Sequence, residues 1–341
     1  MLKEFWYPVA CIKDLKENRP LGVEIFDEWI AIFLDSSKNV VAVEDRCLHR
    51  NARLSKGKVV NGELTCPYHG WRYCNNGQLS SVPSEGPKFT PSASKCIKSF
   101  ETYLQDGYIY LKLKSSSNGT SRIPFKIPYL GANGYKHIRL SHKFRAQVPN
   151  CAENFIDIPH TTFVHPNIFR YEQEPQLIQS DVELKDGNVH VRYLNETSNF
   201  GIFSKFLNSK SSTIFHEDNY YFPNITHVEY RFSEKMHFNI TSQSVQVTKD
   251  ETMVYTDLTY NYGFWNLFAK PFVRWVGKKI IAQDVDIMRQ QSDVTAKYGQ
   301  QFLSMPSDIQ HVFIELIYDC LRNDKDPTTL PNRQKRVDFW I

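Results

Sequence analysis

The chain has 341 residues, of which 41% are hydrophobic and 23% are charged, so it has a globular composition and room for two domains. Its net charge is +4, from 41 basic and 37 acidic residues, which is too small to indicate nucleic-acid binding. The N-terminal residues contain no long apolar segment, so we expect no signal peptide, no transmembrane segment and a cytoplasmic location.

Residues 1–114 are expected to form an all-β domain. Short apolar or alternating segments separated by glycines are typical of strands joined by tight turns. These segments are 30–34, 40–43, 64–66 and 108–113. The next segment, 115–123, contains a run of serines with asparagine and glycine, and it is expected to be a flexible linker.

Residues 124–341 are expected to form a second domain with both strands and helices. Five segments have the pattern of strands in an antiparallel sheet, namely 182–184, 189–193, 226–232, 237–247 and 253–262. Apolar residues at helical spacing predict helices over about 272–296 and 306–321. The predicted fold class is therefore α+β.

Two short motifs separated by sixteen residues carry the strongest chemical signal. Cys47 and His49 form a CxH motif, and Cys66 and His69 form a CxxH motif. One thiolate and one imidazole from each motif can hold a [2Fe–2S] cluster, with both cysteines on one iron and both histidines on the other. A zinc site is the alternative, because zinc also binds Cys and His. The Pro-Tyr-His-Gly-Trp context of the second motif is unusual for a zinc loop.

This stretch resembles the Rieske domain of Rieske non-heme iron ring-hydroxylating oxygenases. Respiratory Rieske proteins carry a disulfide beside the cluster, but the matching positions here are Ala52 and Tyr68. The oxygenase or ferredoxin branch is therefore favoured. The resemblance implies a Rieske domain of small antiparallel sheets over 1–114, and a START-like helix-grip domain over 124–341 that holds a mononuclear iron.

A second group of candidate ligands follows about ninety residues later. Asp157 and His160 share one face if the segment is helical, and His165 comes within reach if Pro159 bends the chain. Two histidines and one carboxylate form a facial triad that holds Fe(II) and leaves positions open for O2. Such a pattern is weak by itself, but after a Rieske motif it resembles the ligand pattern of the oxygenase family.

The third ligand is expected from the helix predicted over 272–296. Helical projection places Asp284 on an inward stripe with Gly277, Ile281 and Met288, and places Asp286 on the solvent side. A carboxylate that faces inward needs a partner, and iron would be that partner. The segment also resembles the ligand-bearing helix of the family, so Asp284 is preferred and Asp286 is the alternative.

The resemblance gives Asp157 a role other than iron binding. It implies that Asp157 bridges the two metal sites for electron transfer, bonding His160 on one side and the cluster histidine His69 of a neighbouring subunit on the other. A carboxylate that holds the free N–H of a metal-bound imidazole is common. This arrangement implies a ring of identical subunits, most simply a homotrimer.

The predicted function is the oxygenase component of a Rieske monooxygenase, resembling vanillate demethylase-like and chlorophyllide oxygenase-like members. Electrons from NAD(P)H would arrive through a reductase or ferredoxin, and oxygen from O2 would enter a small organic substrate by hydroxylation or oxidative demethylation. Dihydroxylation is one alternative. An electron carrier fused to a lipid-binding module and a zinc-dependent interaction protein are two others. Substrate-binding residues remain unassigned, with aromatic candidates Phe155, Phe163, Phe238, Tyr255, Tyr260 and Phe264.

Overall fold

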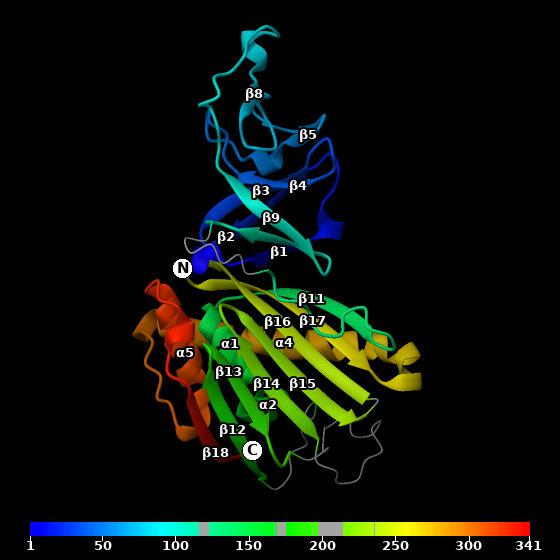
Figure 1. The fold of residues 1–341 in the computed structure, drawn as a ribbon, viewed down its shortest axis with the longest axis vertical. Helices are drawn as coiled ribbons and strands as arrows, with labels where there is room; N and C mark the ends of the chain where they lie inside the picture. Colours follow the sequence, from blue (N-terminus) through cyan, green and yellow to red (C-terminus); the bar gives the residue numbers. More distant parts are fainter. Residues whose placement is uncertain (116–122, 167, 169–174, 197–213, 235) are drawn as a thin grey trace. The chain divides into compact units, whose positions relative to one another are not determined.

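Figure 1 shows the chain as a computed structural model, which describes residues 1–115, 123–166, 168, 175–196, 214–234 and 236–341. The chain divides into two compact units, and each is described by itself. The N-terminal unit comprises residues 3–126 and 247–249, and the C-terminal unit comprises 1–2, 127–246 and 250–341. Most of the expected linker, residues 116–122, lies outside the described residues.

The N-terminal unit consists of antiparallel strands. They are β1 (Tyr7–Cys11), β2 (Leu21–Ile25), β3 (Glu28–Leu34), β4 (Val40–Glu44), β5 (Lys58–Val60), β6 (Glu63–Thr65), β7 (Arg72–Tyr73), β8 (Leu79–Ser81), β9 (Ser99–Gln105) and β10 (Tyr108–Lys112). One sheet has the order β1-β10-β9-β4-β3-β2 and the other has the order β5-β6-β7-β8. Buried side chains from both sheets, such as Phe33, Val43, Leu64 and Leu79, form one core.

The four strands expected in this unit are present as β3, β4, β6 and β10. Strand β1 lacks a clear sequence signal, because Pro8 lies within it and all five of its residues are buried, which removes the alternation of apolar and polar positions. Strands β5, β7 and β8 have only two or three residues each, too few to show a period.

The C-terminal unit is built on one antiparallel sheet. Its strands are β11 (Lys136–Phe144), β12 (Leu177–Lys185), β13 (Asn188–Tyr193), β14 (Phe215–Tyr221), β15 (Ile225–Ser233), β16 (Met236–Thr248), β17 (Glu251–Asn261) and β18 (Arg333–Trp340). Their order is β11-β17-β16-β15-β14-β13-β12-β18. The five expected strands are confirmed, whereas β11, β14 and β18 were missed, because polar side chains interrupt their apolar patterns.

Within the described residues, four α-helices accompany this sheet: α1 (Val148–Ile156), α2 (Pro159–Val164), α4 (Asn266–Tyr298) and α5 (Ile309–Arg322). The long helix α4 runs across the sheet and contacts β11, while α5 contacts α1 and β13 (Figure 1). Helix α4 begins six residues before the expected start, because Pro271 is accommodated within its second turn. The predicted α+β class, with a β-rich N-terminal unit and a C-terminal antiparallel sheet with helices, is confirmed.

Apolar side chains of α4 form a core with the edge of the sheet. Val273, Ile281 and Met288 of α4 pack with Leu140 of β11 and Leu258 of β17. Each of these five side chains is at most 8% exposed, so the helix is fixed in rotation about its axis. None of the described helices is long and apolar enough to cross a membrane.

Candidate metal centres

The two Cys/His motifs of the N-terminal unit form loops with the same hydrogen bonds. The N–H of Cys47 donates to the carbonyl of Ala52, and the N–H of Cys66 donates to the carbonyl of Trp71, five residues on in both loops. The carbonyls of Cys47 and Cys66 each accept from the N–H four residues on. The residues at that position, Asn51 and Gly70, have φ values of 57° and 72° and close the turns.

The four predicted cluster ligands lie together in these loops. Cys47 and Cys66 are buried side by side, and the rings of His49 and His69 have centroids 4.5 Å apart. Burial raises the pKa of the Cys66 thiol, while burial and the neighbouring His69 lower the pKa of His49. The His49 imidazole is therefore favoured in the neutral form that binds metal.

Two aromatic residues border this group. Trp71 stacks on the His49 ring with centroids 4.7 Å apart and covers that face of the ring. Tyr73, which the sequence did not single out, places its hydroxyl 3.3 Å from Cys47 Sγ, and the N–H of Leu48 donates to the same hydroxyl oxygen at 3.0 Å. The tyrosine proton is thereby directed to the sulfur, and hydrogen bonds to cluster sulfurs tune the reduction potential.

The second group of candidates begins where α1 ends. Helix α1 stops at Ile156 and α2 starts at Pro159, so Asp157 and His160 do not share one continuous helix, and the chain is distorted at Pro159 as the sequence suggests. Pro159 interrupts the helix because it cannot donate a backbone hydrogen bond. Asp157 lies two residues before the new helix, and its Oδ2 accepts a hydrogen bond from the backbone N–H of His160 in the first turn at 3.2 Å.

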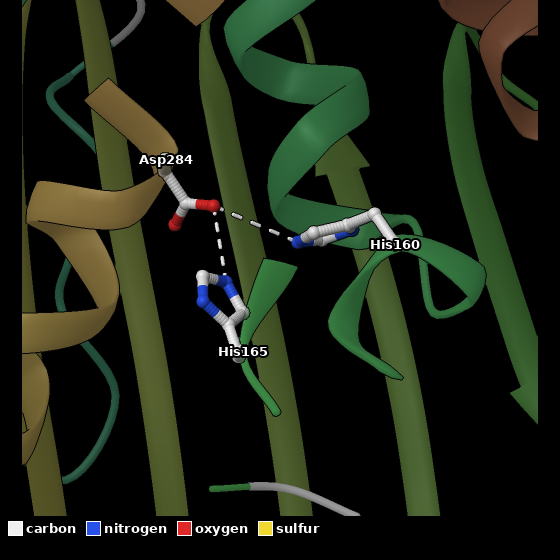
Figure 2. A group of neighbouring side chains, drawn as sticks. All are labelled: His160, His165 and Asp284. Atoms are coloured by element: carbon white, nitrogen blue, oxygen red, sulfur yellow. Dashed lines mark ion pairs between the residues drawn. The ribbon is translucent and has the colours of Figure 1, made fainter. Parts of the chain in front are cut away.

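Three donor groups converge in the C-terminal unit, from α2, the residue after it and α4. Asp284 Oδ1 lies 3.0 Å from His165 Nε2 and 3.7 Å from His160 Nε2 (Figure 2). The two imidazole rings have centroids 5.3 Å apart and an interplanar angle of 77°. The donor atoms all lie within 4.8 Å of one another, a spacing that suits ligands of a single metal ion.

The outward-facing ring nitrogen of each histidine has its own partner. Nδ1 of His160 lies 3.2 Å from Asp157 Oδ2, and Nδ1 of His165 lies 3.1 Å from Gln283 Oε1. These contacts hold each Nε2 toward Asp284, as is usual for metal-bound histidines. No local pattern in the sequence singles out Gln283, because its contact with His165 joins residues that are 118 positions apart in the chain.

The two acidic candidates on α4 have opposite environments, as the helical projection predicted. Asp284 is 4% exposed, whereas the Asp286 side chain is 59% exposed and accepts a hydrogen bond from Arg289 at 2.8 Å. Asp284 lies on the buried side of α4 with Ile281 and Met288. Asp286 therefore lies outside the donor group.

Both donor groups fit the metals that the sequence predicted. Nδ1 of His49 and Oδ1 of Asp284 are buried, and neither has a hydrogen-bond partner among the described residues. Such atoms are rare in proteins unless a ligand completes them. Burial disfavours the charged form of His160, but Asp157 and Asp284 outweigh it and raise its pKa, so the local potential also favours a bound cation.

A mostly apolar cavity opens beside the second donor group. About 880 Å³ of empty space, which includes open solvent at the mouth, lies between its walls. His160, His165 and Asp284 line it, together with apolar side chains from α1, the sheet and α4, including Phe155, Val228, Phe238, Ile240, Leu258 and Ile281.

Only two of the six aromatic candidates line this cavity. Phe155 and Phe238 do, and Tyr255 and Tyr260 are buried elsewhere. Phe163 and Phe264 are 83% and 75% exposed. Whether an aromatic side chain faces the cavity depends on its position along a strand or on the rotation of its helix. Neither can be predicted from the residue type alone.

Comparison with known families covers both groups of donors. A "Rieske [2Fe-2S] domain" model matches residues 5–101, and a "Vanillate O-demethylase oxygenase C-terminal domain" model matches residues 144–310. This chain belongs to the Rieske non-heme iron oxygenases. A Rieske domain carries a [2Fe–2S] cluster, and the oxygenase family uses a mononuclear iron and O2, which confirms the cofactors predicted for this oxygenase-family chain.

Curated relatives of this Rieske oxygenase chain match about half of it. Methylxanthine N1-demethylase NdmA of Pseudomonas putida is 31% identical over 191 residues, which cover 53% of this chain and 52% of the relative. Protein TIC 55, chloroplastic, of Pisum sativum is 30% identical over 48% of this chain and 29% of the relative. The chain thus spans about half or less of the length of these relatives.

Solved structures share the fold along nearly the whole chain. The NdmA QL mutant with theobromine, from Pseudomonas putida, has a TM-score of 0.78 at 20% identity, covering 98% of this chain and 97% of that one. Dicamba monooxygenase bound to dicamba has a TM-score of 0.78 at 18% identity, covering 95% of this chain and 98% of that one. At these identities the likeness concerns the fold alone.

Proposed function

We propose that this chain is the oxygenase component of a Rieske monooxygenase that hydroxylates or oxidatively demethylates a small organic substrate. The observation that carries this proposal is the convergence of His160, His165 and Asp284 beside a mostly apolar cavity. Demethylases and dicamba monooxygenase among the similar proteins support the reaction class. The alternative of an electron carrier fused to a lipid-binding module gives no reason for a buried Asp284 carboxylate that faces two histidines at the cavity wall.

The two donor groups would hold the cofactors. Cys47, His49, Cys66 and His69 would hold the [2Fe–2S] cluster, and His160, His165 and Asp284 would hold the mononuclear Fe(II). When bound, the cluster supplies electrons and the ferrous ion activates O2. The protein fixes both imidazoles through Asp157 and Gln283, and the apolar walls exclude water and hold the substrate next to the donors.

We also propose that Asp157 is the electron-transfer bridge to His69 of a neighbouring subunit in a homotrimer. In this chain, Asp157 already contacts Nδ1 of His160 and is only partly buried, so it remains accessible to a partner. A ferredoxin or flavin reductase would bring electrons from NAD(P)H. A cytoplasmic location is supported by the cysteines, because none of the seven, all within the described residues, forms a disulfide, as expected in a reducing compartment.

Demethylation can be tested with the purified chain, NADH, a ferredoxin and its reductase. The probes are panels of N-methyl and O-methyl aromatic compounds, and the products are formaldehyde and oxygen incorporated from labelled O2. We expect His160→Ala to abolish product formation and to keep the visible spectrum of the cluster. His142→Ala, on β11 and outside the cavity, is the matched control and should keep the wild-type rate. Equal rates for His160→Ala and the wild type would refute the proposal.

A further inference from the structure

A buried charged cluster lies in the sheet beneath the cavity. His216 and Asp218 are two residues apart on β14, so their side chains lie on the same face of the sheet. Asp218 stands in register with Val228 of β15, which stands in register with Ile240 of β16. All three line the cavity, so one carboxylate is set into a row of apolar residues at the cavity wall.

Close contacts hold this cluster together. His216 Nδ1 lies 2.5 Å from Glu196 Oε2, and its Nε2 lies 2.8 Å from Asp218 Oδ1. The hydroxyl of Tyr193 donates to Asp218 Oδ2 at 3.0 Å. Glu196, His216 and Asp218 are each at most 2% exposed. A histidine ring with a carboxylate at both nitrogens is held in its doubly protonated form.

The charge balance of the cluster is negative. Burial opposes charge on His216, but Asp218 and Glu196 outweigh it and raise its pKa to about 9. Burial raises the pKa of Asp218, while His216 and Tyr193 act in the opposite direction. When both carboxylates are ionised, they outnumber the single imidazolium, and the cluster carries one net negative charge beneath an apolar cavity.

Only one member of the cluster reaches the cavity. Tyr230 stacks on the His216 ring with centroids 4.0 Å apart, and Tyr193 lies against it at 4.4 Å. Glu196 and His216 are absent from the cavity lining, whereas Asp218 forms part of it. The cluster therefore positions the Asp218 carboxylate, and each of its oxygens keeps a lone pair beyond the bond that it already accepts.

Tyr230 also lines the sheet wall, and two further hydroxyl groups of that wall are already paired with each other. Ser242 Oγ and Thr256 Oγ1 lie 3.1 Å apart, so each hydroxyl has a partner within the wall. Burying charged groups is costly, and apolar residues of similar size often stabilise a fold as well. Stability alone therefore gives no reason for a charged cluster at the wall of a cavity, whereas recognition of a ligand does.

We propose that Asp218 is the substrate anchor of this cavity and that it accepts a hydrogen bond from an N–H or O–H group of the substrate. The substrate class is a largely apolar molecule, neutral or cationic, that carries such a donor. Carboxylic acids are disfavoured, because a second negative charge would meet Asp218 without water between them. This inference rests on the proposed function, since it names the substrate class of that same cavity.

The test is equilibrium dialysis of the iron-loaded chain without reductant, so that no turnover occurs. Three probes of similar shape are compared: indole, which has an N–H donor; benzothiophene, which has none; and benzothiophene-2-carboxylate, which is an anion. A charge-assisted hydrogen bond predicts that the wild type binds indole at least about tenfold more tightly than benzothiophene. The carboxylate should bind most weakly.

Two variants of Asp218 and one control variant show whether Asp218 or another part of the wall causes the preference for indole. Asp218→Val should reduce the preference for indole to within about twofold and should weaken the rejection of the carboxylate. Asp218→Asn keeps the shape if the valine variant does not fold, and it should also bind the carboxylate more tightly than the wild type does. Ser242→Ala, in the same wall, should keep the wild-type order of affinities.

Three results would contradict the proposed role of Asp218. The wild type could show no preference for indole, the preference could persist in Asp218→Val, or it could disappear in Ser242→Ala. Iron content is measured on the same samples. Loss or absence of the mononuclear iron would refute the oxygenase function, while the order of probe affinities would still decide the role of Asp218. The two proposals can therefore fail separately.

Discussion

Each histidine beside Asp284 is oriented by a side chain on its far side. Asp157 contacts Nδ1 of His160 at 3.2 Å, and Gln283 contacts Nδ1 of His165 at 3.1 Å. Two different hydrogen-bond acceptors thus perform the same task. Only Asp157 also borders a second, smaller hollow lined by Asn150 and Gln291, so it has an exposed side on which a partner can act.

Asp157→Asn tests the bridge at the residue scale. The amide can still accept a hydrogen bond, so both metal sites should stay filled, but the charge that links them is lost. We expect reoxidation of the reduced cluster by O2 in the presence of substrate to slow by about 10- to 100-fold. Stopped-flow absorbance measures this rate, and Asp286→Asn is the control. A rate equal to that of the wild type would remove Asp157 from the electron path.

Asp284 and Asp286 are compared by the same alanine substitution. Asp284→Ala removes the buried donor that both histidines face, so iron content should fall by about one atom per chain. Asp286→Ala removes only an exposed partner of Arg289 and should leave the iron content unchanged. Elemental analysis after gel filtration gives both numbers. Loss of iron in Asp286→Ala alone would reverse the assignment.

The position of α4 depends on one residue without a side chain. A Cβ at Gly277 would lie 3.0 Å from Leu258 Cδ1 and 3.4 Å from Leu140 Cδ1, so the helix rests directly on the sheet at this point. Asp284 lies two helical turns further along the same buried side. Displacement of the helix at Gly277 would therefore move Asp284 away from the histidines.

Gly277→Val is the corresponding prediction at the element scale. The added methyl groups should overpack the contact with Leu258 and lower the free energy of unfolding by about 1–3 kcal/mol. Part of the mononuclear iron should be lost as well. Urea denaturation measures the stability, and Ala282→Val, on the exposed side of α4, is the control with little expected effect. Equal stability of the two variants would show that α4 tolerates a side chain there.

The sequence predicts local chemistry better than long-range contacts. Cys47, His49, Cys66 and His69 could be recognised because their spacing lies within two short loops. The inward position of Asp284 followed from helical periodicity alone. The contact of Gln283 with His165 and the cluster around His216 could not be predicted, because each joins segments whose pairing is decided by the sheet.

At the scale of the whole molecule, the chain combines two units with one candidate iron centre in each. The N-terminal unit offers thiolate and imidazole donors, which suit an electron-carrying cluster. The C-terminal unit offers imidazole and carboxylate donors beside a cavity, which suit an ion that activates O2 near a substrate. The function proposed for the chain needs both centres in the same polypeptide.

Quantification of iron and acid-labile sulfide in the purified chain tests this requirement most directly. The two donor groups predict about three irons and two sulfides per chain, in a coloured protein that loses about one iron but no sulfide in His165→Ala. A colourless protein that contains zinc, or one with two irons in both the wild type and His165→Ala, would contradict the account.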